Sequence, residues 1–135
     1  MGALTGTPLG RAALLLVAAD VAHALDHTRQ GRDLAPEVST AGIAGWIGLA
    51  LLLVLVARRH GLAAPYAAAV GLSVAAGFVA VHALPRWSAF SDPYSGFAPD
   101  ALSWALVALP VLAALLLVVR AVEVLRAGGR VAAAS

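Results

Sequence analysis

Three observations predict an all-α protein, a four-helix transmembrane bundle. The chain has 135 residues, of which 61% are hydrophobic and only 12% charged, and its mean hydropathy of +0.90 is far above that of soluble globular domains. Its apolar runs approach the ~20 residues that a membrane-spanning helix needs. Alanine and leucine, which favour helices, dominate these runs. Since only helices and closed barrels satisfy their backbone within lipid, we expect one integral membrane domain over residues 1–135.

Four spans are expected, separated by polar or irregular segments. They lie at about residues 9–27, 41–57, 64–84 and 100–125, with a structured outer loop at 85–99. The first span follows a short lead. A polar link comes next, in which residues 37–40 supply N-cap candidates for the second span.

The third and fourth spans have their own start signals. Pro65 suits the first turn of the third helix, and Asp100 is an acidic start for the fourth. Between them, the loop contains three prolines, which exclude a regular helix, and four aromatic residues, which are typical of a cap at the membrane interface.

Glycines predict the packing faces of two spans. Gly42, Gly45 and Gly48 fall three residues apart in the second span, and Gly71 and Gly77 lie in the third. Small residues at such spacing let helices approach closely in lipid. We therefore expect both stretches to pack against neighbouring helices.

Arginine distribution predicts the orientation. Six arginines lie at the start of the first span, between the second and third, and at or beyond the end of the fourth; the other two connections hold three, namely Arg29, Arg32 and Arg86. Positive residues favour the cytoplasmic side, so we expect an up-down-up-down bundle in the plasma (inner) membrane with both termini cytoplasmic. All nine basic residues are arginine, which is typical of a GC-rich bacterial genome. In a competing interpretation, residues 1–24 form a cleaved signal peptide.

Composition also excludes several classes of function. The chain has no cysteine, so disulfides, thiolate metal sites and thiol catalysis are excluded. The net charge is +2, but the basic residues are scattered singly or in pairs between apolar runs. They form no basic face of the kind that nucleic-acid binding requires. The expected partners are the lipid bilayer and a second copy or a larger membrane complex.

The most informative stretch closes the first span and holds four ionisable residues. On a helix, Asp20, His23 and His27 fall within an arc of ~60°, with Asp26 on the far flank of His23. Such a stripe is unfavourable toward lipid and must face protein or water. Asp20 lies nine residues beyond Arg11, roughly 13 Å into the bilayer, where a carboxyl group needs a bound proton or a cationic or metal partner.

The expected topology brings a third histidine to the same place. The first and third spans both run outward, so His82 arrives on the side of His23 and His27, whereas His60 lies on the opposite side. A His-x-x-x-His pair is a spacing that holds divalent metals. We expect His23, His27 and His82 to bind Zn, Fe, Mn or Cu, with Asp20 as the fourth ligand.

Other residues are expected around this metal site. Asp26 is a candidate for orienting a ligand, and Asp92 and Tyr94 of the outer loop are candidates for a lid. The motif lacks the glutamate of the His-Glu-x-x-His hydrolases. No catalytic residue is therefore assigned, and whether the protein is an enzyme stays open.

Three alternatives remain at this point. The chain could be a structural or accessory subunit of a larger membrane complex without its own ligand. It could bind b-type haem, with His23 or His27 and His82 as axial ligands. It could also be a small proton-coupled transporter with Asp20 as the titrating group, in which case four helices would require a homodimer.

Overall fold

The structure is a computed structural model that describes residues 2–31, 33–96 and 98–133. It is all-α, as the sequence predicts, and four of its helices are long and apolar enough to cross a membrane. These are α2 (Pro8–Arg29), α3 (Pro36–Ala57), α4 (Ala63–Phe78) with its π-helical extension η1 (Val79–Ala83), and α5 (Ala101–Ala133). Two short elements accompany them, α1 (Gly2–Gly6) and the 3-10 turn η2 (Tyr94–Gly96).

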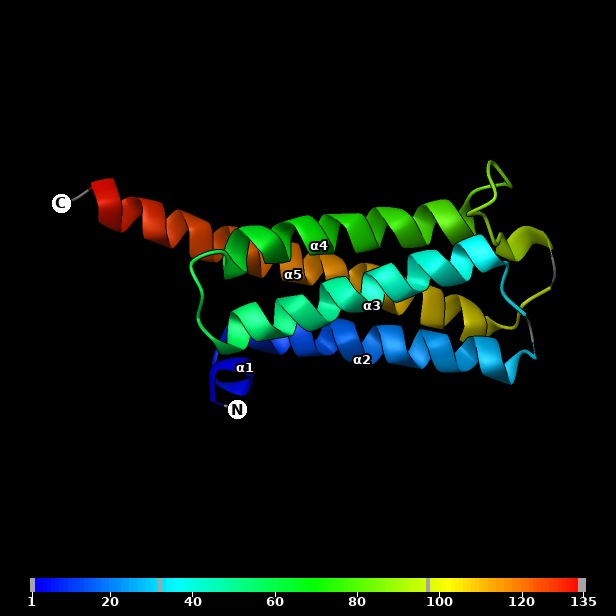
Figure 1. Ribbon diagram of the computed structural model, residues 1–135, viewed down its shortest axis with the longest axis horizontal. Coiled ribbons are helices and arrows are strands. Elements are labelled where there is room, and N and C mark those ends of the chain that lie inside the picture. The colour runs from blue at the N-terminus through cyan, green and yellow to red at the C-terminus, as the bar shows by residue number, and fades with distance from the viewer. Residues whose placement is uncertain (1, 32, 97, 134–135) are drawn as a thin grey trace.

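The four long helices lie side by side along the long axis of the molecule (Figure 1). Both chain termini lie at one end of the bundle, together with the connection between α3 and α4. The link from α2 to α3 and the loop from η1 to α5 lie at the opposite end. The end of α2 and the η1 turn, which carry three of the four histidines, therefore lie at the same end of the bundle.

The second long helix begins earlier than the sequence predicts. It starts at Pro36 rather than at residue 41, after Ala35 in an extended conformation (φ −56°, ψ 145°). Proline suits this position because its φ angle is already helical and its missing N–H would be unpaired there. Thr40 does not cap the helix, since its hydroxyl donates to the Pro36 carbonyl at 2.8 Å, within the first turns.

The last helix starts as expected and ends later. Asp100 caps α5, because its Oδ1 accepts a hydrogen bond from the Ser103 N–H at 2.8 Å. The helix continues past the expected end at residue 125 to Ala133. No proline follows Pro110 to interrupt it, and Arg120 pairs with Glu123 at 2.9 Å on its surface, as residues three apart on a helix can.

Small side chains dominate the core, so the helices approach closely. Among the described residues, ten of the sixteen that form the buried apolar cluster are alanines, and Leu16, Leu52 and Leu117 are its fully buried leucines. The closest approach is at Gly71 of α4, where a Cβ would lie 2.7 Å from Val118 Cγ2 and 2.8 Å from the Ala114 carbonyl oxygen of α5. The predicted packing role of Gly71 is confirmed.

The predicted packing face of α3 is wrong in its first half. A Cβ at Gly42 or Gly45 would meet no other atom within 4 Å, and one at Gly48 would meet only the Tyr66 hydroxyl, at 3.6 Å. Instead, α3 is buried through Leu49, Leu52 and Val56 in its second half. The physical reason is that the larger residues bury more apolar area, so they hold the helix while its glycine-rich half stands away from the bundle.

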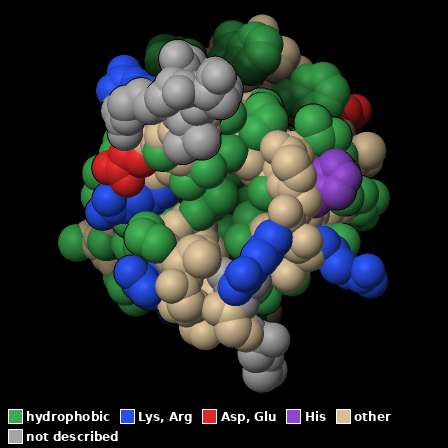
Figure 2. Space-filling view, turned by 90° about the vertical axis from the view of Figure 1, so that its left-hand side faces the viewer, with side chains coloured by type: hydrophobic (Ala, Val, Ile, Leu, Met, Phe, Trp, Pro, Cys, Tyr) green, Lys and Arg blue, Asp and Glu red, His purple; other side chains and the backbone are tan. Residues whose placement is uncertain are grey.

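Basic side chains surround the end of the bundle that carries both termini. Figure 2 looks onto this end and shows blue basic groups at several points around it. The connection between α3 and α4, which lies here, contains Arg58 and Arg59. At the opposite end, Arg29 is paired with Asp26 and Asp100, while Arg32 lies outside the described residues.

Candidate metal site

Two helical segments position the three histidines. His23 and His27 lie one turn apart on α2, so their side chains emerge on the same face. His82 lies in η1, where the Leu84 N–H bonds to the Val79 carbonyl at 3.1 Å and closes a wider turn. Single π-helical turns occur often at functional sites. Pro85 follows and ends the helix.

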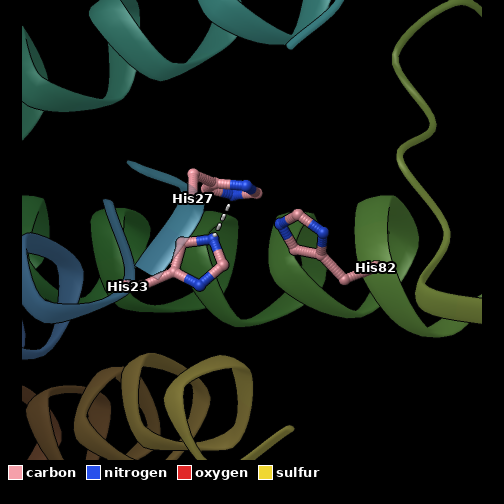
Figure 3. Close-up of side chains that lie close together, drawn as sticks. All are labelled: His23, His27 and His82. Atoms are coloured by element: carbon pink, nitrogen blue, oxygen red, sulfur yellow. Dashed lines mark hydrogen bonds between the residues drawn. The ribbon is translucent and has the colours of Figure 1, made fainter. Parts of the chain in front are cut away.

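The three imidazole rings converge, as the sequence predicts (Figure 3). One nitrogen from each ring can be chosen so that all three lie within 4.8 Å of one another. The Nε2 atoms of His23 and His27 are 3.0 Å apart. Ring centroids lie 4.6 Å apart for His23 and His27, 4.9 Å for His23 and His82, and 5.7 Å for His27 and His82.

All three rings are buried, which is unusual for histidine side chains. His23, His27 and His82 are only 6%, 8% and 5% exposed. Phe78 packs edge-on against His23, with ring centroids 4.8 Å apart. By strict hydrogen-bond geometry the Nδ1 atom of His23 is unpaired among the described residues, but the backbone of Leu106 in α5 lies close enough to the His23 ring to interact with it.

A backbone carbonyl orients the third ring. The Nδ1 atom of His82 lies 3.1 Å from the Asp92 carbonyl oxygen. A carbonyl oxygen only accepts, so the proton is on Nδ1 and the lone pair is on Nε2. This is the arrangement that orients metal-binding histidines in proteins. The Asp92 carboxylate lies further away, with Oδ2 at 3.9 Å from the same nitrogen.

Tyr94, in the loop between η1 and α5, packs against His82. Its side chain is 1% exposed, and its ring lies edge-on to His82 and to Trp104, with centroids 5.0 and 5.3 Å apart. The loop is tied back to the helix end, because the Asp92 N–H donates to the Val81 carbonyl at 3.0 Å. The structure thus places Asp92 and Tyr94 beside His82, where the sequence predicts a lid.

The two acidic residues of the stretch have different surroundings. Asp20 is half-buried and lines a cavity next to the histidines, but it is not among the residues whose ligand atoms come together. The expected fourth ligand is therefore not brought to the cluster. The physical reason is helical rise. Asp20 lies seven residues before His27 on α2, which is almost two turns or about 10 Å along the helix axis, and its side chain is too short to span that distance.

Asp26 belongs to a separate polar network that the sequence does not predict. It is 2% exposed, accepts from Arg29 Nε at 2.7 Å and also accepts from the Gln30 amide. Arg29 and Gln30 both donate to the Ser103 hydroxyl of α5 at 2.9 Å. Of the residues in this network, the sequence points only to Asp100, as the acidic start of the fourth helix. In the structure Asp100 also pairs with Arg29. Asp26 therefore joins α2 to α5, and its charge also acts on the ring of His23.

The fourth histidine lies apart, as expected. His60 is exposed in the connection between α3 and α4, and its Nδ1 accepts from the Leu62 N–H at 3.1 Å. It therefore provides an internal comparison for the three buried rings.

Comparison with known proteins gives no match. No protein-family model matches the chain, and neither the curated proteins nor the solved structures include one that is significantly similar to it. The site is thus interpreted from its own residues. These define a helical protein whose four long apolar helices are compatible with a membrane and enclose a cluster of three histidines that could hold a metal ion.

Proposed function

We propose that the protein is a multi-pass protein of the plasma (inner) membrane that binds a divalent transition metal through His23, His27 and His82. One observation carries this proposal, namely the convergence of three buried imidazoles from two helices within 4.8 Å. Neutral imidazole is the commonest metal ligand in proteins. Four helices of suitable length and hydropathy support the membrane location.

The spacing of the donor atoms suits a metal ion. Nitrogens bound to one Zn²⁺ at about 2.0 Å lie about 3.3 Å apart in a tetrahedral site. The Nε2 atoms of His23 and His27 are already 3.0 Å apart. The largest separation in the cluster, 4.8 Å, exceeds the tetrahedral value by about 1.5 Å, which side-chain rotation can supply.

The orientation of the rings also supports a metal rather than a purely structural role. The Asp92 carbonyl fixes the orientation of the His82 ring through Nδ1, as in sites where an outer group orients a ligand.

The donor set narrows the choice of metal. Three imidazoles without sulfur suit Zn²⁺, Cu²⁺ and Fe²⁺, whereas Mn²⁺ prefers oxygen ligands. Three protein ligands leave a fourth position open, as in catalytic zinc sites. A metal with an open position can polarise a bound group or activate water. The proposed site could therefore bind a further ligand at the metal, in addition to holding the metal ion itself.

The proposed topology is up-down-up-down with both termini in the cytoplasm. It rests on the arginines of the connections, since Arg58 and Arg59 lie at the same end as the termini and positive residues favour the cytoplasm. At the other end, Arg29 is balanced by two aspartates. The histidine cluster then lies toward the outer surface.

Two of the alternatives receive less support. An axial pair of haem ligands must have the macrocycle between its two rings, but the rings of His23 and His82 touch edge-on with centroids 4.9 Å apart. A purely structural subunit has no need for buried imidazole nitrogens that converge.

A proton-coupled transporter is a second candidate, because Asp20 lines a cavity and makes no hydrogen bond or ion pair with another described residue. An acid at such a depth typically marks a proton or ion path. Proton flux into vesicles that depends on a solute, and that stops on Asp20→Asn, would favour this function.

Elemental analysis of the detergent-purified protein tests the metal site. After incubation with Zn²⁺ and removal of free metal, we expect one Zn²⁺ per chain in the wild type and in His60→Ala, and a loss of affinity of more than about 100-fold in His82→Ala. His60→Ala is the matched control because His60 is exposed at the other end. No bound metal in the wild type, equal binding by His82→Ala, or a haem Soret band would overturn the proposal.

A further inference from the structure

A cavity of about 350 Å³ adjoins the histidine cluster. It lies between α2, α3 and α4, and the three histidines form part of its wall. The remaining wall is mostly apolar, with two polar exceptions from the middle of the spans, Asp20 and Ser73. Its other lining residues include Gly42, Gly45, Trp46, Phe78 and Phe90.

The cavity exists because the first half of α3 stands away from the bundle. Gly42 and Gly45 line it, and neither would bring a Cβ within 4 Å of another atom. Trp46 lines the same wall and is 36% exposed. The glycines therefore leave room beside the histidines instead of closing a helix contact.

The cavity is covered at the end of the bundle that carries the loop between η1 and α5, whereas it is open between the helices on its long side. Tyr94 is 1% exposed and packs on His82, and the Trp87 indole N–H ties the loop to the Ala80 carbonyl at 2.7 Å. By contrast, Ala24, Gly45 and Ser73, which line the cavity, are exposed. They belong to spans that the bilayer would surround, so a molecule would enter sideways from the lipid.

We infer that the open metal position binds the oxygen head group of a membrane-soluble amphiphile, whose apolar chain fills this cavity. The inference rests on the proposed metal site. The cavity has a polar end, formed by the histidines, and a mostly apolar remainder. A ligand that fits it has a polar head group at one end and an apolar chain at the other. At ~30 Å³ per water-sized group, the volume accommodates roughly ten such groups, which corresponds to a head group and a chain of eight to ten carbons.

Alkyl hydroxamates are suitable probes, because their head group binds metals through oxygen and their chain length can be varied. The protein is loaded with Co²⁺, whose visible absorption reports ligand exchange. Decanohydroxamic acid carries both the head and a chain, acetohydroxamic acid carries the head alone, and methyl decanoate carries a chain without the metal-binding head. We expect decanohydroxamic acid and acetohydroxamic acid to change the cobalt spectrum, and methyl decanoate to leave it unchanged.

Cavity variants separate the inference from partitioning of the probe into detergent. Gly45→Leu fills the cavity, and Ala41→Leu is a second blocking variant on the same wall. Ala44→Leu adds the same side chain at an exposed position of α3 outside the cavity lining. Decanohydroxamic acid should bind about tenfold more weakly to the blocking variants than to the wild type and Ala44→Leu, while acetohydroxamic acid should bind all four equally.

The outcomes distinguish the cavity from the metal site. A wild type that holds no cobalt would overturn the metal site and this inference together. A wild type that holds one cobalt, but binds decanohydroxamic acid equally with and without the blocking leucines, would overturn the amphiphile alone. Loss of both hydroxamates in the blocking variants with cobalt retained would do the same, because the leucine would then block the metal rather than the chain.

Discussion

Arg29, in the last turn of α2, binds both carboxylate oxygens of Asp100, which precedes α5. Nη1 lies 2.9 Å from Oδ2 and Nη2 lies 3.0 Å from Oδ1. The residues are 71 positions apart in the chain, so this fork-like pair ties the two helices together at the end of the bundle that holds the histidines. Paired geometry of this kind is the strongest form of an arginine–carboxylate contact.

Acid should weaken this tie at a defined pH. The Ser103 N–H and the Arg29 guanidinium lower the pKa of Asp100 from 3.8 to about 2. Because the folded-state pKa is depressed, the stabilisation is fully present above about pH 4 and is lost as the pH falls through about 2. Thermal unfolding in detergent should show the wild type more stable than Asp100→Asn at pH 5, with the difference shrinking toward pH 2. A constant difference would contradict the prediction.

Asp26 should matter for stability more than any exposed acid of the chain. Its buried carboxylate accepts from Arg29 at 2.7 Å and from Gln30. Asp26→Ala removes hydrogen bonds to a charged group and should lower the free energy of unfolding by about 2 kcal/mol. Asp33→Ala, at an exposed position in the following link, is the control and should change it by less than about 0.5 kcal/mol. Denaturant titration measures both, and equal effects would refute the structural role.

Asp20 should not be needed for metal binding. It lines the cavity but is not among the residues whose ligand atoms converge. Asp20→Asn should therefore leave the Zn²⁺ affinity of the purified protein unchanged, whereas His23→Ala should lower it more than about 100-fold. Calorimetric titration with Zn²⁺ gives both values. A large loss of affinity in Asp20→Asn would restore this residue as the fourth ligand.

Gly71 should be intolerant of even one added methyl group. A Cβ there would lie 2.7 Å from Val118 Cγ2 and 2.8 Å from the backbone oxygen of Ala114, and a backbone atom yields little. Gly71→Ala should lower the free energy of unfolding by about 1–3 kcal/mol, as overpacking does. Gly77→Ala, on the same helix with no atom within 4 Å of the new Cβ, should not destabilise the protein. Similar unfolding curves for the two variants would contradict this packing.

Several features of the fold and the site follow from local sequence. The length and hydropathy of the apolar runs predict four helices able to span a membrane, and the structure has them. His23 and His27 are four residues apart, which on any α-helix places them on one face. Asp100 caps α5 because an acidic side chain before a helix can accept from the free N–H groups of its first turn.

Only the tertiary structure decided which of these groups meet. The π-helical turn η1 aims His82 at the α2 pair. The second half of α3 packs, while glycines of its first half line a cavity. Asp26 pairs with Arg29 and Gln30. The physical reason is range. Helix formation and the face of each residue depend on neighbours within a turn or two, whereas contacts between helices depend on how all side chains pack together at once, which no short stretch of sequence encodes.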